Sequence, residues 1–347
     1  MKRVIRLAAL TGTLALLAGC AATPNSAPTP TAKPKVYVTA PLTGIKFEEG
    51  TNKFLAGPSV ACKIDNLDVA RPQVGIDRAD IIFDEMVEGG LTRFVAIFHS
   101  DLPNAVGPVR SIRPMDPDII SPLGGIVCYS GGQLKFVNMM RATDVYNASE
   151  TAEQGKGTFS RDKTRTAPHN VIVDVAKLAG AHPDLAAPAG MFDFAADAAS
   201  ATAVTDGVEV LSFKAYYPSA LAEWTWSASS WVRKQDGKVH ESVGAGQLKA
   251  DNVVVMRMKI DHQYGKVPKT VMVGSGPVSV FTGGKVVEGT WSKTNQTAPI
   301  VLTDAKGMRI KLAPGKTWVE LNPVNSEGGN LKVTLAPKPK PTPTPTN

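Results

Sequence analysis

Two polar segments of the chain contain residue types that can bind or transform anions. The first covers residues 107–114, a turn bounded by glycine and proline in which Arg110 and Arg113 stand three positions apart. A guanidinium group can donate two parallel hydrogen bonds to a carboxylate or a phosphate. This spacing therefore predicts two arginines that present their side chains to an anion.

The second segment covers residues 161–170 and reads R-D-K-T-R-T-A-P-H-N. Its three cations are Arg161, Lys163 and Arg165. His169 adds an imidazole that can change its charge near neutral pH, so it is a candidate general acid or base. The two segments together predict an anion site. Solvated loops whose arginines pair with nearby aspartates are the alternative, and the sequence fits both.

A β-hairpin is predicted over residues 80–99, because two apolar runs flank a Gly-Gly dipeptide that suits a two-residue turn. In this register Glu85 pairs with Phe94, and Glu88 lies diagonal to Arg93 as a surface ion pair. Glu85 then shares its face of the hairpin with phenylalanines. A register shift of one residue would exchange the faces and remove this environment.

A carboxylate among aromatic side chains must raise its pKa or find a cation. Glu85 is therefore a candidate general acid, or a residue that orients a ligand-binding arginine. The alternative is a structural ion pair without a role in binding.

The signatures of several enzyme classes are missing from the sequence. It contains no G-x-S-x-G, no H-E-x-x-H and no P-loop, and no two histidines stand four residues apart. The aspartates lack the spacing of a calcium loop. We therefore expect no metal and no cofactor, and a binding protein rather than an enzyme. Trp224 and Trp226 share a strand face and could stack on a sugar ring, or else pack in the core.

The elements that must position these residues fall into two regions. Residues 40–195 alternate strand and helix patterns, which predicts an N-terminal α/β domain with a mixed sheet. Strands are expected at residues 60–64, 81–87, 91–99, 126–130 and 169–173, and helices at 116–121, 132–142 and 174–181. Residues 207–335 are mostly strand, with hairpin turns at 235–238 and 282–285, which predicts a β-rich C-terminal domain. The overall class is α+β.

The first 20 residues predict export and lipidation. A basic start precedes an apolar run at residues 7–17, which is too short to span a hydrocarbon core of about 30 Å. The run L-A-G-C at residues 17–20 resembles the bacterial lipobox, in which the cysteine is acylated. Residues 1–19 are thus a predicted lipoprotein signal peptide, and Cys20 anchors the protein at the extracytoplasmic face of the cell membrane. An ordinary signal peptide with an incidental cysteine is the alternative.

The two ends of the mature chain carry its positive charge. Residues 20–39 predict a disordered tether, and residues 336–347 a tail of Pro, Lys and Thr. The formal net charge is +7, of which three charges belong to the signal peptide and four to lysines of the tether and tail. The folded part is therefore neutral overall, which argues against a nucleic-acid partner.

Cys62 and Cys128 are the two cysteines that remain after lipidation, and both lie in short apolar runs. Outside the cell such a pair can form a disulfide bond. Two buried thiols that act as small hydrophobic side chains are the alternative.

Several of these motifs resemble the YerB-like lipoproteins of Gram-positive bacteria. The matching runs are A-R-P-Q-x-G at 70–75, A-D-I at 79–81, E-G-G-x-T-R-F at 88–94, G-P-V-R-S-x-R-P at 107–114, R-x-K-x-R-x-A-P-H-N at 161–170, G-T-W at 289–291 and P-G-K-T-W at 314–318. The resemblance implies an α/β architecture with a separate C-terminal domain and a lipid anchor. The domains of this family have no known function, so the resemblance implies no ligand.

We expect the N-terminal domain to bind an anionic ligand of the cell envelope, such as a wall polymer or the carboxylates of a partner protein. The residues expected to hold this ligand are Arg110, Arg113, Arg161, Lys163 and Arg165. One alternative is a cell-envelope hydrolase of a glycan or phosphodiester, with Glu85 or His169 as acid or base. Another is a solute-binding lipoprotein of a transporter.

Overall fold

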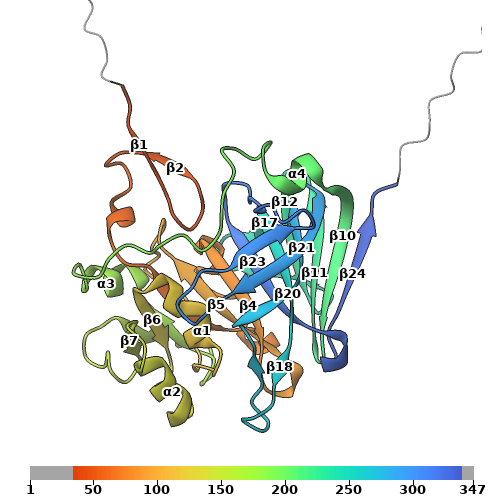
Figure 1. Ribbon diagram of the computed structural model, residues 1–347. Helices are drawn as coiled ribbons and strands as arrows, with labels where there is room; N and C mark the ends of the chain where they lie inside the picture. Colours follow the sequence, from red (N-terminus) through yellow and green to blue (C-terminus); the bar gives the residue numbers. More distant parts are fainter. Residues whose placement is uncertain (1–33, 338–347) are drawn as a thin grey trace, which may run out of the picture. The chain divides into compact units, whose positions relative to one another are not determined.

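One large mixed sheet organises the chain from residue 34 to residue 337, the part that this computed structural model describes (Figure 1). The predicted signal peptide, Cys20, most of the tether and the end of the tail lie outside these residues. From Val36 onward the chain forms one unit by its internal contacts. Within the described residues, no helix has the length and apolar character needed to cross a membrane.

The N-terminal half, residues 36–195, supplies one end of this sheet. Its strands in the sheet are β3 (Val60–Asp65), β4 (Ile81–Met86), β5 (Thr92–Phe98), β6 (Ile126–Tyr129) and β7 (Tyr146–Ser149). Smaller hairpins pair β1 (Tyr37–Thr39) with β2 (Lys46–Glu48) and β8 (Phe159–Arg161) with β9 (Val171–Val173). The helices are α1 (Asp116–Ile120), α2 (Leu134–Arg141) and α3 (Val175–Gly180). β3, β6 and β7 are parallel neighbours, and β5 runs antiparallel between β3 and β4.

The C-terminal half, residues 207–335, continues the same sheet with antiparallel strands. The longer strands are β10 (Val208–Tyr217), β11 (Ala220–Ser227), β12 (Ser230–Gln235), β17 (Asn252–Met258), β20 (Gly274–Thr282), β21 (Lys285–Lys293), β23 (Thr317–Pro323) and β24 (Asn330–Leu335). The shorter strands are β13 (Lys238–Val239), β14 (Glu241–Ser242), β15 (Gly246–Gln247), β16 (Lys249–Ala250), β18 (Ile260–Asp261), β19 (Lys269–Thr270) and β22 (Val301–Asp304). The short helix α4 (Thr202–Asp206) precedes β10.

The two halves meet in the middle of the sheet, where β23 runs parallel to both β17 and β4. The predicted fold class is confirmed, with a mixed α/β part followed by a β-rich part. The proposed division into domains at 40–195 and 207–335 stays a prediction, because the shared sheet links both regions.

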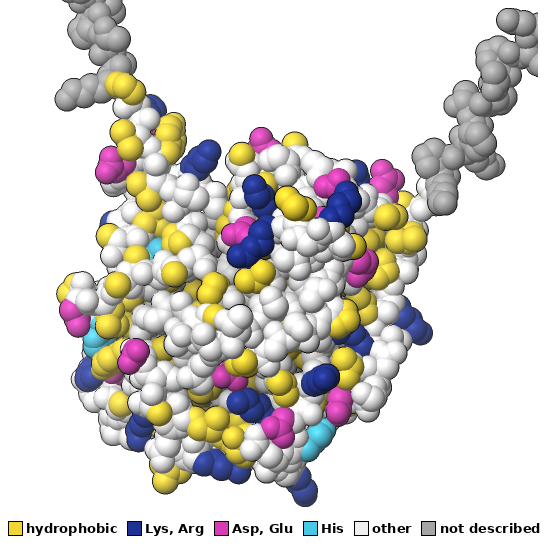
Figure 2. All heavy atoms as spheres, viewed as in Figure 1, with side chains coloured by type: hydrophobic (Ala, Val, Ile, Leu, Met, Phe, Trp, Pro, Cys, Tyr) yellow, Lys and Arg dark blue, Asp and Glu magenta, His cyan; other side chains and the backbone are white. Residues whose placement is uncertain are grey.

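Both faces of the central strands are covered. β4 and β5 are buried along their whole length, which is typical of strands in the middle of a covered sheet. One face packs against α1 and α2, and the other packs against α3. Trp224 and Trp231 are fully buried in the core on the α3 side of the sheet, so Trp224 packs in the core and is not exposed to a sugar ring. On the face of the molecule seen in Figure 2, basic and acidic side chains are interspersed, as expected for a folded part without net charge.

A buried polar cluster joins the halves at the β4–β23 contact. Arg233 Nη2 lies 2.7 Å from Asp84 Oδ2 and 3.5 Å from Glu320 Oε1. Glu320 also accepts hydrogen bonds from Tyr217 and Trp224, each at 2.9 Å. Burial and the nearby Glu320 raise the pKa of Asp84 well above its usual range, and Arg233 opposes this. The charged groups of the cluster are fully buried, so loss of either Asp84 or Arg233 would leave an uncompensated charge inside the shared sheet.

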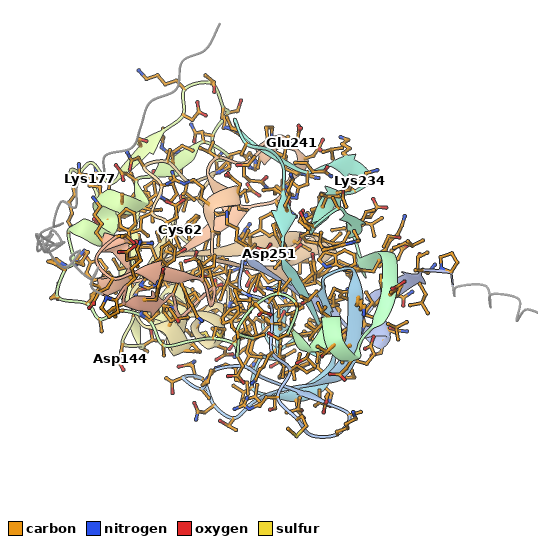
Figure 3. All side chains as sticks on the ribbon, turned by 90° about the horizontal axis from the view of Figure 1, so that it is seen from above. Cys62, Asp144, Lys177, Lys234, Glu241 and Asp251 are labelled. Carbon is orange, nitrogen blue, oxygen red and sulfur yellow. A yellow bond between two sulfur atoms is a disulfide. The ribbon has the colours of Figure 1, made fainter. Side chains whose placement is uncertain are left out.

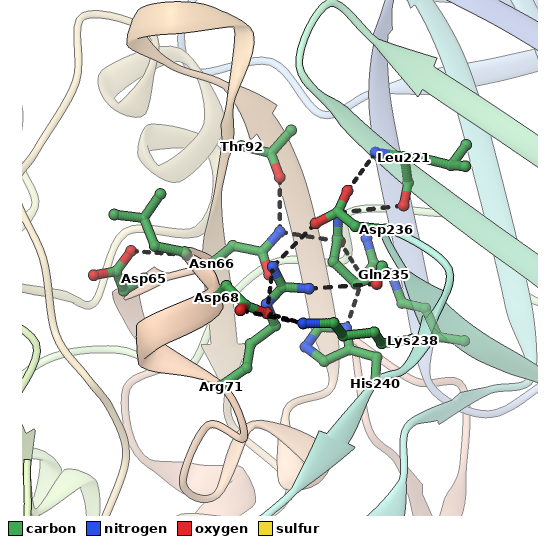
Figure 4. Close-up of polar contacts among 12 residues, drawn as sticks. Asp65, Asn66, Asp68, Arg71, Thr92, Leu221, Gln235, Asp236, Lys238 and His240 are labelled. Carbon is green, nitrogen blue, oxygen red and sulfur yellow. Dashed lines mark hydrogen bonds and ion pairs between the residues drawn. The ribbon is translucent and has the colours of Figure 1, made fainter.

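A second set of polar contacts links the loop after β3 to the β12–β13 hairpin, as Figure 4 shows. Asn66 Nδ2 donates to Thr92 Oγ1 at 2.7 Å and to Gln235 Oε1 at 3.1 Å. Arg71 forms an ion pair with Asp236 at 3.0 Å. These contacts place the loop after β3 in a fixed position relative to the C-terminal half.

The β4–β5 hairpin differs by one residue from the predicted register. Glu85 pairs with Arg93 rather than with Phe94. The reason is the turn, in which residues 88–90 form a 3-10 turn closed by a hydrogen bond from Val87 N to Leu91 O. Three residues therefore lie between Val87 and Leu91, which close the turn, instead of the two that were predicted. Glu85 still shares its face with Phe83, two residues along β4, but it lies opposite Arg93, so the predicted neighbour Phe94 was wrong.

Cys62 and Cys128 lie opposite each other in the neighbouring parallel strands β3 and β6. A disulfide bond joins them, with their Cα atoms 4.6 Å apart (Figure 3 labels Cys62). Of the two alternatives left open by the sequence, the structure contains the bonded pair.

Candidate functional site

Polar side chains gather at the edge of the sheet where the parallel strands β3, β6 and β7 end. Asp65 is the last residue of β3, and Ser130 and Glu150 directly follow β6 and β7. Ligands of α/β sheets commonly bind at the carboxyl ends of parallel strands, where the strand order changes. The edge is therefore a physically reasonable place for a site.

The arginine turn at residues 107–114 crosses this edge as an extended segment. Arg110 N donates to Lys63 O at 2.8 Å, and Arg110 O accepts from Ser130 N at 2.9 Å. Ile112 N donates to Gly131 O at 3.1 Å. These backbone hydrogen bonds insert the segment between the ends of β3 and β6, which places its arginines over the sheet. The site that we call the arginine edge consists of Arg93, Arg110, Arg113, Arg161, Asp65 and His169.

Asp65 and His169 form a close pair at the arginine edge. His169 Nδ1 lies 2.6 Å from Asp65 Oδ2, and Arg110 Nε lies 3.1 Å from the same oxygen. The Asp65 side chain is 1% exposed, whereas the His169 ring is 19% exposed. Within the described chain, Nε2 of His169 has no hydrogen-bond partner. With the proton on Nδ1, the buried carboxylate orients the ring and leaves Nε2 as its basic nitrogen.

Arg113 binds a carboxylate of the chain itself. Its Nε and Nη2 atoms both lie 2.9 Å from the carboxylate oxygens of Glu88. Burial alone would raise the pKa of Glu88, but a backbone hydrogen bond and Arg113 bring it below its ordinary value. The predicted ion pair between Glu88 and Arg93 was therefore wrong, because the altered hairpin register turns Arg93 inward.

Arg93 is a buried guanidinium without a direct ion pair among the described residues. It is 6% exposed, and no carboxylate of the described chain lies within 4.0 Å of it. Its Nη1 donates to Ser111 O at 3.1 Å, and its Nε has no acceptor. Burial and the nearby charges of Arg113 and Arg110 lower the pKa of Arg93 to about 10, although the carboxylates of Asp65 and Glu85 oppose this change. The arginine edge therefore contains a buried cation whose charge is offset only at longer range, without a direct ion pair in the described chain.

Glu85 belongs to a buried triad beneath the arginine edge. Lys63 forms ion pairs with both Glu85 and Asp116, the latter at 2.7 Å. Burial and the charge of Asp116 raise the pKa of Glu85 to about 7, although Lys63 opposes them. Asp116 also accepts a hydrogen bond from the backbone N–H of Arg113. Glu85 is 0% exposed, so the geometry matches the structural ion pair, and the triad supports the arginine turn from below.

The three cations of the 161–170 loop are placed differently from one another. Arg161 joins the edge, with Nη2 2.5 Å from Glu150 and Nη1 2.9 Å from Asn170. Arg165 points to the segment at residues 70–72, where its guanidinium donates to two backbone carbonyls. Lys163 is exposed and makes no ion pair within the described chain. Arg165 therefore fixes the loop, and Lys163 remains available to a ligand. Arg161 keeps 51% of its side chain exposed but is already paired with Glu150.

The sequence reasoning missed four charged residues that shape the site, namely Lys63, Asp65, Arg93 and Asp116. Asp65 could have been found from the sequence, because it directly follows the apolar run at residues 60–64 and precedes the polar Asn66. The cavities outlined in the described chain are lined by other residues, so the arginine edge does not coincide with them. Within residues 34–337, no group of three or more His, Cys, Asp or Glu side chains could hold a metal ion.

A mixed α/β half that shares its sheet with a β-rich half is the architecture of a two-part family with no known function. The model of the N-terminal domain of DUF3048, a protein family of unknown function, matches residues 42–187. The model of the C-terminal domain of DUF3048 matches residues 211–319. The chain belongs to this family, and the resemblance to YerB-like proteins is confirmed.

One relative has both a curated sequence and a solved structure. The YerB protein of Bacillus subtilis (strain 168), which is named as a lipoprotein, is 27% identical over 295 residues. The match covers 82% of this chain and 86% of the relative. The crystal structure of YerB from Bacillus subtilis has a TM-score of 0.70 at 24% identity, and the match covers 85% of this chain and 99% of that one. The shared fold therefore extends over both halves.

Proposed function

We propose that this chain is a lipid-anchored protein at the outer face of the cell membrane, and that its arginine edge binds an anionic ligand of the cell envelope. The L-A-G-C run at residues 17–20 and the lipoprotein name of the Bacillus relative support the anchor at Cys20. A protein held there meets wall polymers with phosphate or carboxylate groups, and the acidic surfaces of envelope proteins.

The single observation that carries this proposal is the guanidinium of Arg93, which is buried without a direct ion pair in the described chain and whose Nε has no acceptor. Burying a charge without a partner costs several kcal/mol, by order of magnitude, unless something compensates it. An anion at the arginine edge would supply the missing charge and accept hydrogen bonds from more than one arginine. Arg110 and Arg113 keep partial exposure, at 19% and 11% of their side chains, so a ligand can reach them.

The ion pairs that the arginines make within the chain determine which kind of anion this site can bind. Arg110 and Arg113 already contact Asp65 and Glu88, so part of their charge is compensated within the chain. A ligand must therefore compete with, or add to, these contacts. A polyanion that reaches Arg161 and Lys163 as well fits this arrangement better than a single small ion does.

A calorimetric titration tests the proposal. Teichoic-acid fragments, which carry phosphodiesters, and muropeptides, which carry carboxylates, are titrated into residues 21–347. Arg110→Ala should weaken binding by about tenfold or more, equivalent to about 1.4 kcal/mol. Lys234→Ala is the matched control, because this exposed lysine of β12 makes no ion pair in the described chain. Wild-type affinity in folded Arg110→Ala would exclude the arginine edge as the binding site.

A hydrolase is the second candidate function, and the Asp65–His169 pair is the observation that favours it. A buried carboxylate that orients a partly exposed imidazole is the arrangement of a general base. Turnover of wall glycans or phosphodiesters by the wild type, abolished in His169→Gln and reduced in Asp65→Asn, would establish this activity. Binding without turnover in the wild type leaves the anion-binding function alone.

A further inference from the structure

A cavity of about 310 Å³ in the C-terminal half takes no part in the roles described above. It lies between α4, the end of β11, the β20–β21 turn and the loops before β17 and β23. The lining side chains that matter here are Val204, Trp226, Asp251, Thr282 and Pro314. Its size is at the lower end of the range for small-ligand sites, about 300–1,000 Å³.

Asp251 supplies the only carboxylate in the described lining of this cavity (Figure 3). Oδ2 accepts a hydrogen bond from the backbone N–H of Lys316 at 2.7 Å. Gly315 has a φ of +148°, and a Cβ atom there would lie 2.2 Å from Oδ2, so the loop needs glycine to approach the carboxylate this closely. Burial raises the pKa of Asp251 above its ordinary value. The carboxylate is thus held in place and partly removed from water.

No lysine, arginine or histidine nitrogen of the described chain lies within 4.0 Å of the Asp251 carboxylate. Two lysines close in sequence to residues of the lining make their side-chain hydrogen bonds elsewhere. Lys316 Nζ donates to the backbone carbonyl of Asp77, and Lys285 Nζ donates to that of Val204 at 2.8 Å. The charge of Lys316 offsets that of Asp251 in part, but within the described chain no cation forms a direct ion pair with this fixed carboxylate.

Trp226 adds an aromatic surface to the same cavity. The indole is half-buried and packs against the fully buried Trp231, with ring centroids 5.3 Å apart. This contact fixes the position of Trp226 while the residue still lines the cavity. A tryptophan face beside a carboxylate is suited to a cation, because the ring quadrupole and the negative charge both attract it.

We propose that this cavity binds a primary alkylammonium group, which donates to Asp251 and lies against Trp226. The group belongs to a lysyl side chain of a peptide or to an aminoacyl ester on a polymer, since both present the same ammonium. The inference does not depend on the arginine edge, which lies in the other half. A neutral sugar stacked on Trp226 is the rival occupant, and the charge of the ligand separates the two.

The test titrates residues 21–347 with n-butylammonium and follows both tryptophan fluorescence and heat. 1-Butanol is the neutral probe of the same shape, and N-acetylglucosamine is the sugar probe. Nα-acetyl-lysine amide and alanine methyl ester then distinguish the two sources of the ammonium. Asp251→Asn removes the charge at constant shape, and Asp144→Asn is the control, because Asp144 is exposed in another part of the chain (Figure 3).

We expect saturable binding of n-butylammonium with a dissociation constant on the order of 1 mM. 1-Butanol and the Asp251→Asn variant should each bind at least about tenfold more weakly, and Asp144→Asn should match the wild type. Wild-type affinity should also fall as the pH drops from about 7 to about 4, because Asp251 becomes protonated. This measurement needs no variant, so a folding defect in Asp251→Asn cannot hide the answer.

Three outcomes overturn the proposal. Equal binding of 1-butanol and n-butylammonium makes the cavity a hydrophobic pocket. Preferential binding of N-acetylglucosamine assigns it to a sugar. Absence of saturable binding to n-butylammonium in the wild type leaves the cavity without this ligand.

Discussion

Replacing Arg93 by methionine should stabilise the unliganded protein. The pKa of this guanidinium falls from 12.5 to about 10 on folding. Each unit of pKa corresponds to about 1.36 kcal/mol, so the surroundings disfavour the charged side chain by about 3 kcal/mol. Methionine also loses the hydrogen bond to Ser111 O, which contributes about 1.5–3 kcal/mol for a charged donor. The expected net gain is about 1 kcal/mol, with methionine filling most of the volume.

The assay is urea unfolding of residues 21–347, with and without the anionic ligand that the calorimetric screen identifies. Arg93→Met should unfold at higher urea than the wild type when no ligand is present. Added ligand should stabilise the wild type by mass action and leave the variant unchanged. Arg93→Lys is the control, because it keeps the charge but loses the planar fork.

One result would refute the reasoning. If Arg93→Met is destabilised by about 2 kcal/mol or more without ligand, the fold itself satisfies the guanidinium. Arg93 would then be a structural residue, and the anion site would lose the observation that supports it.

Three further predictions concern other parts of the chain. The free energy of unfolding should fall as the pH rises from 4.5 through about 7, because folding raises the pKa of Glu85 and the folded state holds its proton in this window. In urea unfolding at a series of pH values, Glu85→Gln should reduce this dependence of the free energy of unfolding on pH. Reduction should lower the free energy of unfolding by about 4 kcal/mol, since the bond between Cys62 and Cys128 closes a long loop, and Cys62→Ala should remove the response to the reductant. Cys20→Ser should move the protein from the membrane fraction to the soluble fraction of cells, whereas retention in the membrane would contradict the lipid anchor.

Local sequence patterns predicted most of the elements around the site. The apolar runs at residues 60–64 and 126–130 are β3 and β6, and the helices predicted at 116–121 and 174–181 are α1 and α3. Each of these runs is bounded by turn residues, so its length and type follow from local chemistry.

The order of strands in the sheet lay beyond local patterns, and the site depends on that order. Glu85 meets Lys63 because β5 separates their strands by one position, and His169 meets Asp65 across 104 residues of sequence. Arg93 was assigned to a solvent face because alternation in a hairpin suggests one. That inference fails in a strand covered on both sides, where an alternating polar residue is buried rather than exposed.

The predicted N-terminal domain should not fold alone, although its sequence reads as a separate α/β unit. Without β23, the strand β4 would become an open edge whose buried residues Ile81 and Phe83 lose their backbone partners. Asp84 would keep its place in β4 but lose Arg233, the cation that compensates it. Residues 36–195 should therefore show no cooperative unfolding transition and few dispersed amide resonances. A cooperative transition in this fragment would show instead that the shared sheet is an interface between two independent domains.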